Sequence, residues 1–125
     1  MRLPDDIRHA VIEPLRSLSP MAIYLFGSYG TPRQHQGSDL DIALLTAQPL
    51  NPVRLFELAN DLSIRIGCEV DLVDLSSAST VMAKEVLRTG ERLLVNNLTA
   101  TQTFEMRTLA DYARLNEERR PVLAR

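Results

Sequence analysis

Two aspartates that stand one residue apart inside an apolar run, Asp39 and Asp41, constrain this chain more than any other feature. The run reads as a short strand, so both side chains point to one face, with Cα atoms about 7 Å apart, and Leu40 points to the other. Two carboxylates on one face repel each other and lose hydration, and no Lys or Arg in the strand neutralises them. A divalent cation resolves this conflict, and hard oxygen ligands suit Mg²⁺ or Mn²⁺.

A Gly27-Ser28 step ends the preceding apolar run and supplies a second part of a site. Glycine lets the backbone approach a phosphate closely. A strand followed by this step and a short helix offers backbone N–H groups and a hydroxyl to an anion. Phosphate donors at one strand end, beside metal ligands on the next strand, predict a nucleoside-triphosphate site.

A third acid is expected from a neighbouring strand. In the stretch CEVDLVDL, residues 68–75, Glu69 and Asp71 share one face, while Asp74 has the opposite parity. Asp71 is the predicted third carboxylate, with Glu69 as its substitute. In two-metal sites the ions lie about 3.5–4 Å apart and clamp the attacking and leaving oxygens. Asp71 would therefore bind a metal, accept the proton of the attacking hydroxyl, or do both.

The spacing of apolar residues predicts the remaining elements. Short apolar runs between turn residues indicate strands, and apolar residues three or four apart indicate helices. Pro14 should kink the first helix or begin a second short one, and Gly67 and Gly90 should end two others. Strands that alternate with helices favour a mixed α/β or α+β layer. We expect strands at 21–26, 39–45, 68–75 and 92–95, and helices at 3–19, 53–67, 81–90 and 102–118.

Length and composition narrow the class of protein. A chain of 125 residues suits one domain, and a net charge of −2 gives no global basic field for nucleic acid. The single cysteine, Cys68, excludes an internal disulfide and suits a reducing cytoplasm. No apolar run approaches the ~20 residues that span a membrane, and the sequence starts with acids and a proline where a signal peptide needs an apolar stretch. We expect a soluble cytoplasmic protein without membrane attachment or direct nucleic-acid binding.

The order of these motifs resembles a known family. Gly-Ser, ten residues and then Asp-Leu-Asp, flanked by apolar strands, is similar to the pattern of the DNA polymerase beta-type nucleotidyltransferase superfamily. The chain looks most like its minimal nucleotidyltransferase (MNT) branch, whose members pair with HEPN toxins. The stretches YLFGSYG, SDLDIALL, CEVDLVDL and GERLLVNN follow that family's order and cover nearly the whole chain. Relatives often read GS-x-A-R-G after the first strand, whereas this chain has Gly30, Thr31 and Pro32, and its arginine is displaced to Arg33.

The resemblance implies a fold and a site. The fold would be an α+β (α/β-type) nucleotidyltransferase fold, with a mixed four-stranded sheet and helices mainly on one face. Residues 1–125 would form a single minimal nucleotidyltransferase domain with a C-terminal helix and tail at about 99–125. The substrate would be ATP. The catalytic and metal-binding residues would be Asp39, Asp41 and Asp71, holding two Mg²⁺ ions, and the nucleotide-binding residues would be Gly27, Ser28 and Ser38.

The resemblance also implies an activity and a partner. Antitoxins of this family transfer AMP from ATP to a tyrosine of the partner HEPN ribonuclease, an all-helical toxin, and so silence it. This chain would be such a protein adenylyltransferase, in a hetero-oligomer with its toxin. About 30 residues follow the last expected strand, too few for an added acceptor domain, so the acceptor would be held largely by another protein or at an oligomer interface. Two alternatives stay open: a non-catalytic antitoxin that neutralises its toxin by binding, and a nucleotidyltransferase for a small-molecule or RNA hydroxyl.

Overall fold

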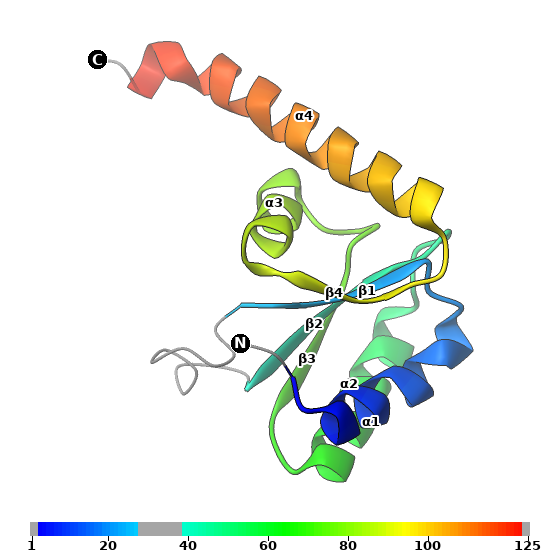
Figure 1. Ribbon diagram of the computed structural model, residues 1–125. Coiled ribbons are helices and arrows are strands. Elements are labelled where there is room, and N and C mark those ends of the chain that lie inside the picture. Colours follow the sequence, from blue (N-terminus) through cyan, green and yellow to red (C-terminus); the bar gives the residue numbers. More distant parts are fainter. Residues whose placement is uncertain (1–2, 28–38, 124–125) are drawn as a thin grey trace.

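The computed structural model describes residues 3–27 and 39–123, which form four strands and five helical segments (Figure 1). All four predicted strands and all four predicted helices are present, and their bounds differ from the predictions by a few residues. In chain order the elements are α1 (Asp5–Leu15), the short 3₁₀ helix η1 (Arg16–Leu18), β1 (Ala22–Phe26), β2 (Leu40–Leu45), α2 (Pro52–Ile66), β3 (Val70–Asp74), α3 (Thr80–Thr89), β4 (Glu91–Val95) and α4 (Leu98–Leu123).

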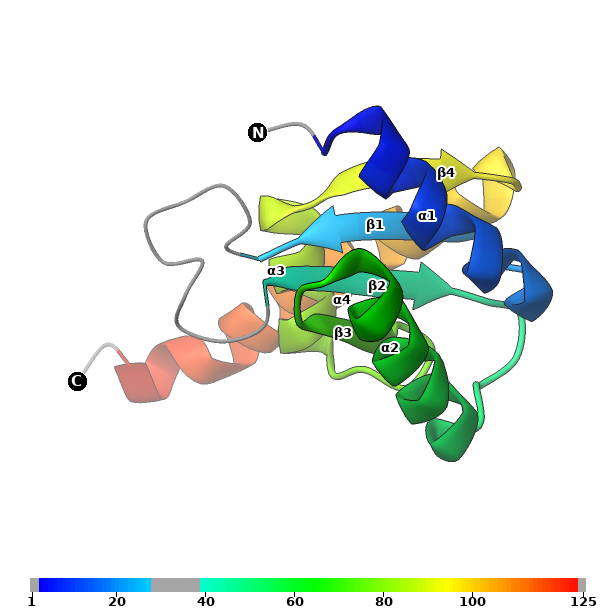
Figure 2. The ribbon, with the colours of Figure 1, turned by 90° about the horizontal axis from the view of Figure 1, so that it is seen from below.

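The four strands form one mixed sheet in the order β3-β2-β1-β4. β1 pairs antiparallel with both β2 and β4, and β2 pairs parallel with β3. The antiparallel pairing brings the end of β1 beside the start of β2, and the parallel pairing puts the start of β3 next to it (Figure 2). The expected α+β fold with a mixed four-stranded sheet is confirmed, and one edge of the sheet gathers these three strand ends.

Helices cover both faces of the sheet (Figure 1). α1 and α2 pack on one, called here the back face, while α3 and α4 lie over the other, the front face. The expectation that helices pack mainly on one face is therefore not met. The physical reason is that every residue of β1 is buried, so both faces need an apolar cover. The strands β1 and β2 contribute Ile23, Leu25, Leu40, Ile42 and Leu44 to the back-face core, and Ala22, Tyr24, Phe26, Ala43 and Leu45 to the front-face core.

The ends of α2 follow from its local sequence. Asn51 precedes the helix, and its side-chain oxygen accepts hydrogen bonds from the backbone N–H groups of Val53 at 2.9 Å and Arg54 at 3.3 Å. Pro52 occupies the first helical position, where its missing N–H costs no hydrogen bond. Gly67 ends the helix in the left-handed conformation, with φ of 84°, as its sequence position predicts.

Two other helix boundaries also bear on the predictions. Pro14 does not begin the second helix: it lies in the last turn of α1, which ends at Leu15, and the separate short helix η1 begins at Arg16. The hydroxyl of Ser79 accepts the N–H of Met82 at 3.1 Å and so starts α3. Gly90 follows the last residue of that helix.

Helix α4 is longer than the helix predicted at 102–118. It begins earlier because Asn97 caps it, accepting the N–H of Ala100 on its side-chain oxygen at 3.0 Å. The spacing of apolar residues alone understates its length, because the helix continues through the charged stretch 117–120 to Leu123. Its C-terminal half extends past the sheet (Figure 1).

The apolar residues of α4 do not all pack on the domain. Phe104 packs against the front-face core. Leu109 is 49% exposed. The ammonium of Lys84 in α3 lies 5.3 Å from the ring centre of Tyr112, a cation–π contact that joins the two helices. In the described ranges, no helix combines the length and the apolar character needed to cross a membrane.

Candidate active site

The sheet edge where three strand ends meet carries the aspartates predicted from the sequence. Phe26 in β1 pairs with Asp41 in β2, and Asp41 pairs with Asp71 in β3. Paired residues on neighbouring strands point to the same face, so Asp41 and Asp71 lie side by side. They belong to the front face, because Ala43 and Val73, two residues further along each strand, pack there. The neighbouring strand thus supplies a third aspartate, as the parity of its residues predicts.

Asp39 lies at the start of β2 and ties it to β3. Its Oδ2 accepts a hydrogen bond from the N–H of Glu69 at 3.1 Å, and its own N–H donates to the carbonyl of Glu69 at 2.9 Å. The side chain of Glu69, the alternative to Asp71, is exposed. Glu69 therefore contacts Asp39 through its backbone.

The three aspartates fit a hard cation by their chemistry, although they do not form a closed cage. Within residues 3–27 and 39–123, no three acidic, imidazole or thiol side chains lie close enough together to hold an ion as they stand. Asp41 and Asp71 nevertheless bring carboxylate oxygens to adjacent positions on one face, the ligands that Mg²⁺ prefers. The metal site stays a prediction.

Gly27 provides the space that the Asp41 carboxylate occupies. A Cβ on Gly27 would clash with Oδ2 of Asp41 and lie 3.2 Å from its Cγ. Gly27 also has a φ of 81°, a conformation that side chains rarely adopt. Its N–H donates to the hydroxyl of Thr89 at 3.2 Å. The predicted partners Ser28 and Ser38 lie outside the described residues, as does Arg33.

Asp74, at the far end of β3, has a structural role. Its carboxylate accepts hydrogen bonds from the N–H of Leu50 at 2.9 Å, from the N–H and hydroxyl of Ser76 at 3.0 and 2.7 Å, and from the hydroxyl of Ser77 at 3.0 Å. Burial by itself would raise the pKa of Asp74, but these hydrogen bonds outweigh it and hold the pKa below its ordinary value. The alternation of side chains along β3 thus puts Asp71 on the front face beside Asp41, whereas the Asp74 carboxylate binds the turn that follows the strand.

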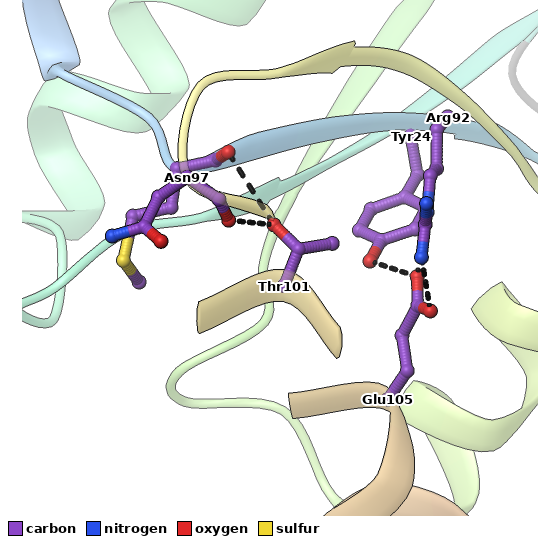
Figure 3. A network of polar contacts seen from close by, with 6 residues as sticks. Tyr24, Arg92, Asn97, Thr101 and Glu105 are labelled. Carbon is purple, nitrogen blue, oxygen red and sulfur yellow. Dashed lines mark hydrogen bonds and ion pairs between the residues drawn. The ribbon is translucent and has the colours of Figure 1, made fainter. Parts of the chain in front are cut away.

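A charged network joins α4 to the front face of the sheet (Figure 3). The hydroxyl of Tyr24 donates to Oε2 of Glu105 at 2.7 Å. The guanidinium of Arg92 in β4 donates to both oxygens of the same carboxylate, at 3.0 and 2.6 Å. These hydrogen bonds, that from Arg92 first, hold the pKa of Glu105 below its ordinary value. Burial, and then the Glu105 carboxylate, raise the pKa of Tyr24.

The same residues border a pocket of about 290 Å³ between α3, α4 and β4. Its lining includes Lys84, Arg88 and Arg92 together with Glu105, so cations outnumber acids at its surface. Arg92 is neutralised by Glu105, and Arg88 donates to Glu85 at 2.6 Å. Two of the three cations that line the pocket, Arg88 and Arg92, are therefore paired with acids of the same chain.

Sequence reasoning missed Thr89 and the network of Tyr24, Arg92 and Glu105. Thr89 lies 62 residues from Gly27 along the chain, and Glu105 lies 81 residues from Tyr24. No motif or spacing in the sequence connects such positions. Only the fold, which returns α3 to the end of β1 and lays α4 over the front face, brings them together.

The fold and this sheet edge define a nucleotidyltransferase: an Asp-x-Asp pair starts one strand, a further aspartate lies beside it, and a glycine turn ends the antiparallel neighbour. Residues 10–99 match the polymerase beta nucleotidyltransferase family, and the chain belongs to this family.

Relatives and solved structures cover nearly the whole chain. The protein adenylyltransferase MntA of Shewanella oneidensis is 39% identical over 115 residues, which span 90% of this chain and 82% of that protein. The solved complex of tri-AMPylated S. oneidensis HEPN toxin with its MNT antitoxin matches with a TM-score of 0.80 at 35% identity, covering 94% of this chain and 93% of the other. A solved toxin–antitoxin structure with AMP-PNP matches with a TM-score of 0.80 at 38% identity, covering 94% and 95%.

Proposed function

We propose that this chain is a Mg²⁺-dependent protein adenylyltransferase that acts as an antitoxin. It transfers AMP from ATP to a tyrosine of a partner HEPN toxin, with which it forms a hetero-oligomer. The observation that carries the proposal is the pairing of Asp41 with Asp71 across β2 and β3, in a chain that matches an MNT antitoxin over almost its full length. A relative named as a protein adenylyltransferase, and a related complex with an ATP analogue, support the reaction and its substrate.

The proposed reaction is an in-line displacement at the α-phosphate of ATP. The acceptor oxygen forms a bond to the α-phosphorus, the bond to the bridging oxygen breaks, and pyrophosphate leaves. Mg²⁺ held by Asp39, Asp41 and Asp71 would neutralise charge on the attacking and leaving oxygens. Asp71, the more exposed residue of the facing pair, would accept the proton of the acceptor hydroxyl.

The remaining assignments are part of the same proposal. Gly27, Ser28 and Ser38 form the nucleotide site, and two Mg²⁺ ions serve the reaction. Residues 1–125 act as a single minimal nucleotidyltransferase domain, with the helix and tail from about 99–125 available to a partner. The free cysteine, Cys68, is consistent with a cytoplasmic location.

A paired-aspartate variant tests the function. The full chain carrying Asp39→Ala and Asp41→Ala should fold like the wild type and lose AMP transfer, because it keeps the apolar strand positions and removes two of the three carboxylates. The measurement is the intact mass of the partner toxin after incubation with ATP and Mg²⁺. A partner toxin whose mass stays constant after incubation with folded wild-type protein, ATP and Mg²⁺ would refute the proposal. Toxin neutralisation that survives in the variant would favour inhibition by binding.

A further inference from the structure

The last turn of α3 holds the end of β1 through one hydroxyl group. Thr89 Oγ1 accepts the N–H of Gly27 at 3.2 Å and donates to the carbonyl of Glu85 at 2.9 Å. The hydroxyl therefore bridges the helix backbone and the strand backbone. Thr89 itself is exposed, so this contact is not needed to fill the core.

Gly90, the next residue, lets the backbones of α3 and β1 approach each other closely. A Cβ on Gly90 would clash with the carbonyl oxygen of Val86 and lie 3.1 Å from that of Leu25 and 3.2 Å from Cβ of Phe26. Its φ of −93° is ordinary, so the need for glycine here comes from space. The last residue of α3 and the glycine that follows it thus contact the end of β1 independently.

Gly27 also meets the candidate site. The Asp41 carboxylate occupies the space that a Cβ on Gly27 would take, while the N–H of Gly27 is bonded to Thr89. A shift of Gly27 toward Asp41 would therefore displace the carboxylate. The position of a predicted metal ligand therefore depends on a helix that carries none of the predicted ligands.

We propose that Thr89 is a positioning residue: it holds Gly27 away from Asp41, so that the carboxylate keeps its place beside Asp71. The N–H of Gly27 serves this contact, and the glycine contributes to the site by the space it leaves rather than by a hydrogen bond to the triphosphate. The inference rests on the proposed function, because it assigns Asp41 to the reacting centre. Misplacement of a reacting group by about 1 Å is expected to cost on the order of 10–100-fold in rate.

Three full-length variants test the proposal. Thr89→Val keeps the shape and removes the acceptor, Thr89→Ser keeps the hydroxyl, and Thr101→Val is a matched control. Thr101 is buried at the other end of β1, where its hydroxyl donates to the carbonyl of Asn97 at 2.7 Å and lies 3.5 Å from that of Met21. AMP transfer to the partner gives kcat and the KM for ATP, and thermal unfolding confirms that each variant folds.

Thr89→Val should lower kcat about tenfold and leave the KM for ATP within about twofold. Thr89→Ser should restore kcat, and Thr101→Val should lower thermal stability without changing kcat. A valine variant with wild-type kcat, or valine and serine variants that are equally slow, would overturn the proposal. A raised KM for ATP with unchanged kcat would show instead that the contact serves nucleotide binding, and would overturn the proposal.

Hydrogen exchange separates this inference from the proposed function. Without nucleotide or partner, the Gly27 amide should exchange slowly in the wild type and Thr89→Ser, and at least about tenfold faster in Thr89→Val. If exchange follows this pattern but no AMP is transferred by wild-type protein, the contact stands and the proposed function fails. Equal exchange in all three proteins would remove the basis of the positioning role.

Discussion

The back and front faces of the sheet are built from the same strands and do different work. Along β2, Leu40, Ile42 and Leu44 face the back and are buried in a continuous apolar core under α1 and α2. The intervening positions face the front, where the strand begins with Asp41 and becomes apolar only from Ala43 onward. The alternation of a strand thus lets one face stabilise the domain while the end of the other carries the polar site.

The front face also holds long-range polar contacts that join two helices to the sheet. Tyr24, Arg92 and Glu105 join α4 to the sheet, and Thr89 joins α3 to the end of β1. This difference between the faces predicts that back-face substitutions lower the free energy of unfolding and leave AMP transfer intact. Substitutions at the front edge should lower AMP transfer instead.

The largest effect on stability is expected at the back face. Leu62 of α2 is 1% exposed in the back-face core, so Leu62→Ala should lower the free energy of unfolding by about 2–5 kcal/mol. Ile64, two residues on, is 82% exposed, and Ile64→Ala should change it by less than about 0.5 kcal/mol. Urea unfolding measures both. At a temperature where each variant is folded, AMP transfer should equal that of the wild type. Slower transfer by folded Leu62→Ala would show that the back face also affects the reaction.

The next effect concerns the two aspartates of β3. Asp71→Asn should lower kcat for AMP transfer by about 10²–10³, the usual cost of removing one group that stabilises transition-state charge, with unfolding unchanged. Asp74→Asn should destabilise the fold by about 1–3 kcal/mol, because it weakens the bonds to Leu50, Ser76 and Ser77. Transfer rates and urea unfolding of both variants give the comparison. An Asp74 variant that folds normally but transfers slowly would reverse these roles.

The alternation of side chains along a strand made the opposite faces of Asp71 and Asp74 predictable from the sequence. The alternation of CEVDLVDL assigns Asp71 and Asp74 to opposite faces without any knowledge of the fold. The Asn51 cap and Gly67 at the ends of α2 are equally local signals.

Contacts between distant segments were not predictable. Tyr24 reads as one more apolar strand residue, and nothing in its surroundings indicates that Glu105 will meet its hydroxyl. The division of helices between the faces depends on which side of the sheet each connection crosses, and local periodicity does not encode this. The same limit applies to Thr89, an ordinary helix-terminal residue until the fold puts Gly27 beside it.

A smaller effect is expected from the front-face network. Glu105→Gln removes the charged bidentate pairing with Arg92 and should cost about 1–3 kcal/mol of unfolding free energy at pH 7. The folded-state pKa of Glu105 lies below its ordinary 4.5, so its contribution is complete above that pH and is lost as the pH falls through the folded pKa. Urea unfolding of both proteins from pH 7 to about 3 should show the difference vanish in acid.

The control for this network lies on the same helix. Asp111 makes an exposed ion pair with Arg114 at 2.8 Å, so Asp111→Asn should change the unfolding free energy by less than about 1 kcal/mol. An equal loss in the Glu105 and Asp111 variants would show that the network contributes no more than a surface pair.

The last comparison concerns two glycines with nearly the same backbone. Gly27 and Gly67 have φ of 81° and 84°, so alanine at either position should cost about 1–2 kcal/mol in backbone strain. A Cβ on Gly67 meets nothing within 4 Å, whereas on Gly27 it meets the Asp41 carboxylate. Thermal unfolding should show the larger loss for Gly27→Ala, and only that variant should lose AMP transfer. Equal losses of stability in the two variants, or AMP transfer retained in Gly27→Ala, would show that the close approach of Gly27 to Asp41 is not important.

The central claim is that Asp41 and Asp71 bind a metal ion at the front edge of the sheet, and Mn²⁺ binding tests it most directly. Electron paramagnetic resonance counts free Mn²⁺ during titration of the full chain in the presence of a non-hydrolysable ATP analogue. We predict that wild-type protein and Asp74→Asn take up Mn²⁺ alike, while the double variant Asp41→Asn with Asp71→Asn binds at least about tenfold more weakly. Undiminished uptake by the double variant would contradict the account.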